Sequence, residues 1–374
     1  MKIDELQTPA ILIYLDSVEH NLKKYDTLAK QNGKQIWPMV KTHKSTELAK
    51  MQKEFGCTGF LCGNLDEAEA LVNMGMDNIM YAYPVATDVS IDRVIKLAKS
   101  CDNFYVRLDG AEAAELLNKA AAGAGLVIKY TLIIDSGLHR FGVAPDKVVD
   151  LANSLKKFEH LQFCGISSHP GHVYGACSHD DLAGYVKDET QSIAYAADAL
   201  RKAGFTLKII SSGSTPTFEG AITDANINIY HPGNYIFNDT IQLSTQTATE
   251  DECALYVLAS VISHPAENLF ICDAGTKCFG LDQGAHGNTS IKGYGTVKGH
   301  PELTVYGLSE EVGKLHVEGP ATNLKVGDKI CIIPNHSCSS ANLTSYLIGV
   351  RGDEVDRPIK VDVRGNSTLK NSIK

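Results

Sequence analysis

The stretch QIWPMVKTHKSTELAKMQKEFGCTGFLC, residues 35–62, indicates the fold class of this chain. It begins with a β-rich apolar run, continues through a helical segment and ends in a second apolar run. The same alternation repeats without a break to about residue 240, and such alternation is typical of a parallel sheet. We expect eight strands, at 35–40, 58–62, 78–83, 103–108, 127–134, 162–168, 207–211 and 225–230. We expect helices at 17–32, 44–55, 65–75, 88–100, 111–122, 145–157, 180–203 and 215–220.

Eight strand-helix units in roughly 200 residues favour a closed (β/α)8 TIM-type barrel over an open doubly wound sheet. The open sheet would be expected to carry Gly-x-Gly-x-x-Gly after its first strand. The nearest match, Gly123-Ala124-Gly125, precedes a strand and lacks the third glycine. For the helix before the first strand, Asp16 or Ser17 is the expected N-terminal cap and Gly33 the expected end.

After about residue 245 the sequence changes to short apolar runs separated by glycine, proline and asparagine. This texture predicts a second, mainly β domain. Its expected strands are 254–262, 269–272, 303–306, 329–333, 345–349 and 359–363.

The composition narrows the range of partners. The 374 residues are 44% hydrophobic and 21% charged, and 35 basic against 44 acidic residues give a net charge of −9. Without a block of lysine and arginine, nucleic acid and anionic membrane surfaces are not expected partners, which leaves small molecules. No apolar run approaches the roughly 20 residues of a membrane span, and the first residues lack the apolar core of a signal peptide, so we expect a cytoplasmic protein. Ten cysteines without a CxxC pair predict free thiols rather than disulfides.

In a barrel the functional residues gather where the strands end. The first strand leads into Lys41-Thr42-His43-Lys44. A lysine at the barrel mouth with its stem against the core could be a nucleophilic amine that forms a Schiff base. A surface lysine whose stem lies along the apolar wall would show the same pattern.

The fifth and sixth strands also run into polar segments, residues 135–142 and 167–174. Asp135 could cap a turn, Arg140 could pair with a carboxylate, and His172 in its glycine- and proline-containing loop could simply be solvated. The coincidence of several such groups at one barrel rim nevertheless favours an active site.

The seventh and eighth strands lead into Ser211–Thr217 and His231–Tyr235. Glycine followed by hydroxyl side chains at a helix start offers the N–H donors, hydroxyls and dipole that a phosphate group needs. These are also the loops where phosphate sites of such barrels recur. An ordinary capped turn would contain the same residue types.

In the second domain, His336-Ser337-Cys338 follows an apolar run. On an extended segment the imidazole and thiolate would point to the same face, and nitrogen plus sulfur ligation suits zinc. Two protein ligands are too few for a closed structural site, so a metal here would be open to substrate. The pair could also be two neighbouring residues without a metal.

Taken together, these motifs resemble those of the fold-type III pyridoxal-phosphate enzymes, and within them the family of D-serine dehydratases and D-threonine aldolases. The resemblance covers nearly the whole chain. One departure from the family pattern is Val312, which stands before Gly313 where the family commonly has a histidine. The residue groups that carry the resemblance are Thr8-Pro9-Ala10 with Asp16 and Asn21, 41–44, 135–140, 171–172, 213–217, 232–235, 273–275, 309–311 and 336–338.

The resemblance implies an alanine-racemase-type barrel, residues 17–245, that binds pyridoxal 5'-phosphate. It also implies a β-domain, residues 1–16 and 246–374, that carries the metal pair, and assembly as a homodimer. Lys41 would hold the cofactor as a Schiff base, with Arg140 near its phenolic oxygen. The other expected cofactor-binding residues are Tyr174, Ser214, Thr215, Gly233, Asn234 and Tyr235. His336 and Cys338 would bind the metal.

Two reactions on a small D-amino acid fit this family. As a dehydratase, the enzyme would use Lys41 as base and zinc to help the β-hydroxyl of D-serine or D-threonine leave, giving a 2-oxo acid and ammonia. As a D-threonine aldolase, it would give glycine and an aldehyde, with His172 as the base. The His-x-Cys pair resembles the pattern of the dehydratase branch, whereas the pattern of the aldolases resembles His-x-Asp. A thiolate ligand also favours zinc over manganese. A non-catalytic pyridoxal-phosphate-binding protein is a third reading, but such proteins are typically a single barrel without a β-domain.

Overall fold

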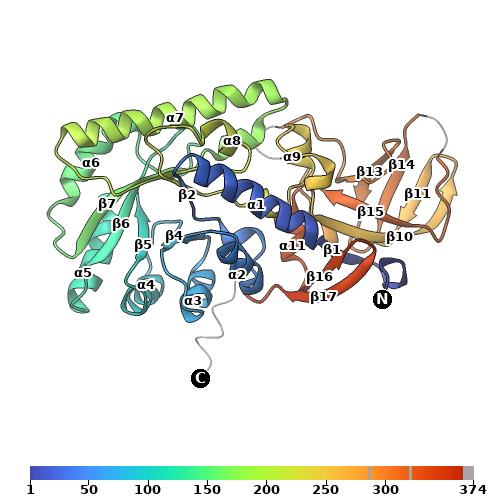
Figure 1. Cartoon of the computed structure of the whole chain (residues 1–374), viewed down its shortest axis with the longest axis horizontal. Helices are drawn as coiled ribbons and strands as arrows, with labels where there is room; N and C mark the ends of the chain where they lie inside the picture. Colours follow the sequence, from blue (N-terminus) through green and yellow to red (C-terminus); the bar gives the residue numbers. More distant parts are fainter. Residues whose placement is uncertain (285–287, 320–321, 365–374) are drawn as a thin grey trace.

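A computed structural model describes residues 1–284, 288–319 and 322–364. It contains a barrel and a second, antiparallel domain, which lie side by side (Figure 1). The predicted fold class, a (β/α)8 barrel plus a mainly β domain, is confirmed.

The barrel strands form one parallel sheet in the described part of the chain, ordered β2-β9-β8-β7-β6-β5-β4-β3. Its two edges meet through a parallel bridge between Met39 and Leu61, which brings the first strand beside the second. The strands are β2 (Gln35–Ile36), β3 (Phe60–Cys62), β4 (Ile79–Tyr81), β5 (Phe104–Leu108), β6 (Ile128–Ile133), β7 (Leu161–Ser167), β8 (Ile209–Ser212) and β9 (Ile229–Tyr230).

Helices surround this sheet because each has one apolar face. In α4, for example, Ile91, Val94 and Ile95 are buried at helical spacing. Side chains of Ser45, Asn64 and Thr87 cap the first turns of α2, α3 and α4 by accepting backbone N–H groups, which fixes where each helix begins. The helices are α1 (Leu15–Gln31), α2 (Thr46–Glu54), α3 (Leu65–Asn73), α4 (Asp88–Ser100), α5 (Ala111–Gly123), α6 (Val148–Leu155), α7 (His179–Lys202), α8 (Phe218–Ala221) and α9 (Thr240–Ser244).

The expected cap of the first helix is wrong. Helix α1 begins at Leu15, directly after strand β1 (Ala10–Tyr14), and the side chain of Tyr14 at the N-cap makes no capping hydrogen bond. Because the helix starts at Leu15, Asp16 and Ser17 lie within its first turn, and neither is at the capping position. Gly33 does follow the helix, with a φ of +66°.

The second domain is built on a nine-stranded sheet within the described ranges, ordered β11-β14-β13-β12-β15-β10-β1-β16-β17. Strand β1 lies in the middle of it, between β10 and β16, so the N-terminal segment belongs to this sheet (Figure 1). The other elements are β10 (Leu255–Ala266), β11 (Leu269–Cys272), α10 (Thr276–Phe279), β12 (Gly295–Val297), β13 (Leu303–Leu308), β14 (Gly313–Val317), β15 (Lys329–Pro334), α11 (Ser337–Asn342), β16 (Tyr346–Arg351) and β17 (Glu354–Lys360).

Two layers of apolar side chains hold the barrel. Alternate strand residues such as Leu61, Met80 and Ile209 form a buried cluster on the inner face of the sheet. Their neighbours, among them Phe60 and Ile79, pack outward against the helices. All ten cysteines are free, as expected. No described helix is long and apolar enough to cross a membrane.

Candidate active site

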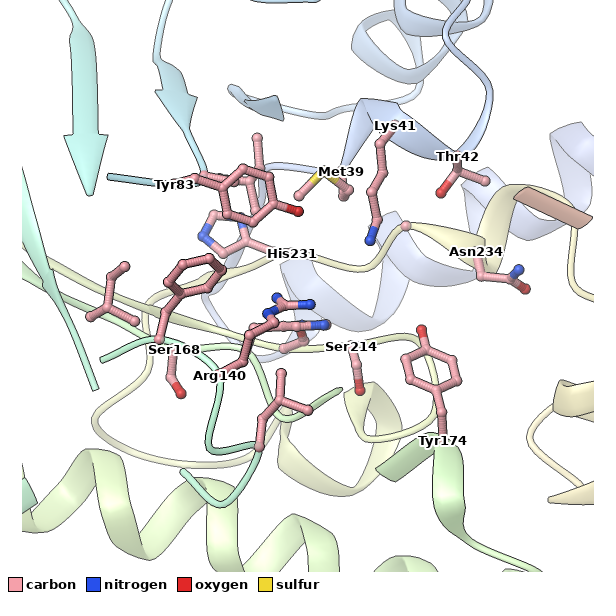
Figure 2. Close-up of a pocket in the computed structure, with 18 of the residues that line it drawn as sticks. Met39, Lys41, Thr42, Tyr83, Arg140, Ser168, Tyr174, Ser214, His231 and Asn234 are labelled. Carbon is pink, nitrogen blue, oxygen red and sulfur yellow. The ribbon is translucent and has the colours of Figure 1, made fainter. Parts of the chain in front are cut away.

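Lys41 lies where strand β2 gives way to a short 3-10 helix, Val40–Thr42. Its side chain lines a cavity at the carboxyl ends of the barrel strands, and its amine points into that cavity (Figure 2). A side chain at Gly63 could not be accommodated without displacing Lys41, since a Cβ there would come 3.0 Å from Lys41 Cβ.

The neighbours of Lys41 in the tetrad connect its turn to the rest of the molecule. His43 Nδ1 accepts a hydrogen bond from the N–H of Ser45 at 3.1 Å, which leaves Nε2–H to donate to Gln52 Oε1 at 3.1 Å. Gln52 in turn donates to the phenol oxygen of Tyr235 at 3.1 Å. Burial lowers the pKa of His43 to about 4, so this buried chain contains a neutral imidazole. It joins the turn that carries Lys41 to the turn that carries Tyr235.

Lys44 forms a 2.5 Å ion pair with Glu67. The Glu67 carboxyl is fully buried and also accepts the N–H of Gly63 at 2.6 Å. Lys44 thus holds the loop after β3 against the Lys41 turn, and its own amine is engaged away from the cavity.

Apart from Lys41 and Arg140, the residues predicted to bind the cofactor divide into two groups. Ser214, Gly233, Asn234 and Tyr174 line the cavity with Lys41 (Figure 2). Thr215 and Tyr235 are not among the lining residues: Thr215 Oγ1 accepts the N–H of Tyr235 at 3.0 Å, and the Tyr235 ring packs against Tyr25. The phenol of Tyr235 therefore points into the core.

The expected helix start after the seventh strand is weaker than the sequence predicts. Residues 215–217 form a turn, and helix α8 that follows has only four residues, Phe218–Ala221. The helix-dipole contribution is small for so short a helix, so hydroxyls and backbone N–H groups are the main anion donors here. Gly213 has a φ of +123°, which favours glycine, and a Cβ at Gly233 would come 2.9 Å from Thr42 Oγ1. Both turns therefore depend on glycine.

Two guanidinium groups line the same cavity. Arg140 lies beside the rings of Tyr83 and Phe141. Arg107 of β5, which the sequence did not single out, is buried and donates to Ser167 Oγ at 2.8 Å and to the Ser168 carbonyl at 2.9 Å. Burial lowers the pKa of Arg107 to about 10. Neither arginine forms an ion pair within the described residues. Arg107 is buried and Arg140 is exposed, and a cavity wall with two cations that lack a carboxylate partner among the described residues favours an anionic ligand.

The histidine predicted as an aldolase base, His172, is not one of the histidines that line the cavity beside Lys41. It packs against the Tyr185 ring, and its Nε2 lies 4.0 Å from Asp188. His169 and His231 do line the cavity. Burial, together with Lys41 and Arg140, holds the pKa of His169 well below its usual range, and burial lowers the pKa of His231 to about 3. Both cavity histidines are neutral.

His336 and Cys338 also line this cavity, although the expectation that they lie on an extended segment is wrong. His336 precedes helix α11, and Cys338 lies in its first turn. The chain turns after β15 because Asp239 accepts the N–H of Ser337 at 3.0 Å. The imidazole and thiol are brought together by this turn rather than by strand alternation.

The charges of this pair are coupled. Burial alone would lower the pKa of His336, but the Cys338 thiolate and the Asp282 carboxylate raise it well above its usual range. Burial would likewise raise the pKa of Cys338, yet His336 lowers it on balance. Asp282 Oδ2 lies 3.2 Å from His336 Nδ1, so Nε2 is the nitrogen that faces the thiolate.

Two family models match the chain. Residues 13–240 match the N-terminal domain of alanine racemase, and residues 254–350 match a putative serine dehydratase domain. The chain belongs to the alanine racemase N-terminal domain family. The resemblance stated from the sequence is thereby confirmed, and with it the expectation of a pyridoxal-phosphate-dependent lyase acting on D-amino acids.

Individual relatives span nearly the whole chain. A 3-hydroxy-D-aspartate aldolase of Paracoccus denitrificans (strain Pd 1222) is 29% identical over 98% of this chain and 94% of its own length. A D-serine dehydratase of Dictyostelium discoideum is 28% identical, covering 94% and 95%. The solved D-threo-3-hydroxyaspartate dehydratase from Delftia sp. HT23 has a TM-score of 0.89 at 26% identity, covering 96% and 98%. A cysteine-to-alanine variant of D-threo-3-hydroxyaspartate dehydratase, solved in a metal-free form, also has a TM-score of 0.89 at 26% identity, covering 96% and 99%.

The cavity fits pyridoxal phosphate. It offers an amine for the aldehyde and a guanidinium for the phenolic oxygen. For the phosphate it offers two glycine turns with hydroxyls. The Nε2 of His231 and the Oδ1 of Asn234 are buried without a hydrogen-bond partner among the described residues, so polar atoms remain for a ligand. For a metal, no group of three or more His, Cys, Asp and Glu occurs in the described ranges, and the His336–Cys338 pair fits a metal with open positions.

Proposed function

We propose that this protein is a pyridoxal-phosphate- and zinc-dependent dehydratase that converts a β-hydroxy D-amino acid, such as D-serine or D-threonine, to a 2-oxo acid and ammonia. The supporting observation is that Lys41 and the His336–Cys338 pair line one cavity. The proposed β-elimination uses a base that removes the proton from Cα and a metal ion that stabilises charge on the β-oxygen. One cavity with both Lys41 and two candidate metal ligands could supply them.

For the cofactor, we propose that Lys41 binds the aldehyde carbon and Arg140 binds the phenolic oxygen. The proposed phosphate ligands are Ser214, Thr215, Gly233, Asn234 and Tyr174, with Tyr235 contributing only its backbone. When bound, pyridoxal phosphate supplies an electron sink for the carbanion at Cα. Arg107 adds positive charge to the wall that faces the substrate.

Lys41 is the proposed base for the α-proton, because its amine points into the cavity and because burial lowers the pKa of both cavity histidines, which makes them weak bases. His336 and Cys338 are the proposed zinc ligands, with Asp282 orienting the imidazole through Nδ1 as carboxylates commonly do at metal-bound histidines. Zinc supplies stabilisation of the negative charge that develops on the β-oxygen. The thiolate ligand favours zinc over manganese.

Aldol cleavage is the second candidate, since the relatives include both aldolases and dehydratases at nearly equal identity. The position of His172 disfavours an aldol cleavage in which His172 is the base, because this residue is not among those that line the cavity. An aldolase would need His169 or another group to take the hydroxyl proton. The aldolases of this family resemble a His-x-Asp pattern, with an aspartate at the position of Cys338, so the cysteine also favours dehydration.

One experiment separates these reactions. The purified, zinc-supplied protein is incubated with D-serine, D-threonine and 3-hydroxy-D-aspartate, and 2-oxo acid and glycine are measured side by side. We expect 2-oxo acid and ammonia in equal amounts and no glycine. Glycine as the main product would make the protein an aldolase, and a cofactor-loaded sample that turns over no D-amino acid would make it a binding protein.

We propose that the protein works as a homodimer, as the resemblance implies, and that it is cytoplasmic, as its lack of long apolar runs predicts. Light scattering of the eluted protein tests the assembly.

A further inference from the structure

Glu189 of helix α7 has a fully buried carboxyl group for which the proposed reaction has no use. The side chain follows Leu182 and Val186 and precedes Ile193 on the face of α7 that packs toward the barrel. No lysine, arginine or histidine in the described ranges pairs with it, and neither carboxyl oxygen has a hydrogen bond of good geometry there. A buried carboxylate in such a place is strongly disfavoured unless it is protonated or finds a partner.

The carboxyl faces two hydroxyls, those of Ser212 at the end of β8 and Thr217 just before α8. The other titratable groups that act on it are Asp224, between α8 and β9, and Tyr230 of β9. Burial raises the pKa of Glu189 to about 7, against the opposing effect of the two hydroxyls, and Asp224 raises it further. All of these neighbours are neutral or acidic.

A chain of hydroxyls leads from Glu189 to the cavity. Thr217 Oγ1 lies 3.0 Å from Ser214 Oγ, and either oxygen can be the donor. Ser214 lines the cavity beside Lys41 (Figure 2). Because the Glu189 carboxyl interacts with the Thr217 hydroxyl, a path of polar groups runs from the carboxyl through Thr217 and Ser214 to the cavity.

The protonation state of Glu189 decides the direction of this chain. A neutral carboxyl donates to Thr217, which then donates to Ser214, which donates into the cavity. An ionised carboxylate accepts from Thr217 instead, so Ser214 loses the donor behind it and a negative charge faces the anion site. A phosphate dianion at the far end therefore favours neutral Glu189.

We propose that Glu189, in its neutral form, is a positioning residue for the cofactor phosphate, acting through Thr217 and Ser214. This inference rests on the proposed function for the identity of the ligand, but it is tested by binding alone. Because the bound state holds the proton more tightly than the free state, phosphate binding takes up a proton. Affinity then falls as the pH rises from about 7.

The test uses the full-length protein and 4-deoxypyridoxine 5'-phosphate, which carries the ring and phosphate but no aldehyde, so that Lys41 forms no bond to it. The dissociation constant and the ³¹P resonance of the bound probe are measured from pH 6.5 to 9. The variants are Glu189→Gln, which always donates and cannot ionise, and the matched control Glu219→Gln on the surface of α8.

We expect the unaltered protein and Glu219→Gln to lose affinity for the probe as the pH rises above about 7, by up to about 10-fold for each pH unit. Their bound ³¹P resonance should titrate in the same range. Glu189→Gln should keep its pH 6.5 affinity to within about two-fold and show a flat ³¹P resonance.

Parallel pH profiles for all three proteins would overturn the inference while leaving the proposed function intact. The wild-type ³¹P titration decides the same point without any substitution, so a poorly folded variant does not remove the test. Absence of probe binding by all three proteins would overturn the proposed cofactor site, and the role of Glu189 with it.

Discussion

Asp239 Oδ2 accepts a hydrogen bond from the backbone N–H of Ser337 at 3.0 Å, and through it the barrel holds the turn between His336 and Cys338. The same oxygen accepts the side-chain amide of Asn234 at 2.6 Å. One buried carboxylate thus joins the proposed phosphate turn of the barrel to the proposed metal turn of the β-domain.

We expect Asp239→Asn to destabilise the protein and to lower its zinc content together. The substituted amide has one acceptor oxygen in place of two. Either the donors at Asn234 and Ser337 or the N–H of Gln242, which Oδ1 accepts at 3.3 Å, therefore lose their partner, which costs about 1–3 kcal/mol per unsatisfied group. Urea unfolding and metal analysis measure the two effects. Asp251→Asn, on an exposed carboxyl, is the control and should change stability by less than about 0.5 kcal/mol. Full zinc content in Asp239→Asn would show that the two turns are independent.

The proposed covalent link to the cofactor predicts that borohydride reduction fixes the label on the peptide containing Lys41. Lys44 is the internal comparison, because it is three residues away but paired with buried Glu67. Lys44→Met should keep the label at Lys41 but destabilise the fold by about 3–5 kcal/mol, as removal of one partner from a buried ion pair does. Peptide mapping by mass spectrometry and urea unfolding check these outcomes, and a label on Lys44 would refute the assignment.

The proposed phosphate turn predicts that Ser214→Ala weakens retention of pyridoxal phosphate by about 1.5–3 kcal/mol, the range for a lost charge-assisted hydrogen bond. Equilibrium dialysis measures the affinity. Ser154→Ala, on the exposed side of α6, should bind as the unaltered protein does. Thr215→Val should weaken binding as well, but it also removes the acceptor for the Tyr235 N–H, so Ser214 gives the cleaner reading. Unchanged affinity in Ser214→Ala would place the phosphate elsewhere.

Buried neutral histidine predicts a specific acid sensitivity. The pKa of His43 is lowered by burial to about 4 against an ordinary value of 6.5, so the unfolded chain binds more protons below pH 6.5. Stability is therefore fully present above pH 6.5 and is lost as the pH falls toward 4, at about 1.4 kcal/mol per pH unit. Between pH 6.5 and 5 this amounts to about 2 kcal/mol.

His43→Asn checks this origin, since its amide oxygen can replace Nδ1 as acceptor for Ser45 but cannot take up the proton. The variant should be about 1 kcal/mol less stable at pH 7 because the bond to Gln52 is lost. Its stability should fall less steeply with acid, so that the two plots of stability against pH cross at about pH 5.8, where the unaltered protein has lost about 1 kcal/mol. Parallel curves would assign the acid sensitivity to other groups.

The sequence predicted the barrel because strand-helix alternation is a local, periodic signal, and it predicted the cavity residues that follow strand ends. It did not predict Arg107, which stands in an apolar strand. It also did not predict Asp239 and Gln52, each of which has a partner more than ninety residues away along the chain. Glu189 had a usable signal: it occupies a buried-face position between Val186 and Ile193, where an apolar residue is the norm.

The proposed metal pair shows a different case, in which two residues that line the cavity were singled out from an incorrect local geometry. His336 and Cys338 at i and i+2 suggest a strand, but the turn into α11 is imposed by Asp239 from another domain. Tyr235 similarly belongs to the expected motif, yet its ring packs beside Tyr25 and its phenol contacts Gln52. The order of residues in a motif did not predict which side chains point into the cavity and which point into the core.

Removal of zinc should separate the two halves of the proposed reaction. Hydroxide is a poor leaving group, and metal coordination stabilises the developing charge on oxygen by several kcal/mol. Proton removal at Cα needs no metal, so a chelator or Cys338→Ala should abolish 2-oxo acid formation from D-serine while exchange of the α-proton with solvent continues. Proton NMR in deuterated solvent measures the exchange, and a coupled assay measures the 2-oxo acid. Cys331→Ala, on a cysteine of β15 outside the cavity lining, controls for loss of a thiol.

If exchange and elimination disappear together, the metal holds the substrate or the site rather than activating the leaving group. If elimination continues at full rate without zinc, the pair has no part in the reaction. Cys338→Asp extends the test to the choice of reaction, because it creates the His-x-Asp pair that the aldolase pattern resembles. A shift from 2-oxo acid toward glycine would connect ligand chemistry to reaction type. Loss of both products would instead place the control of that choice in the groups that face Cα, of which Lys41 and His169 are the nearest candidates in the cavity wall.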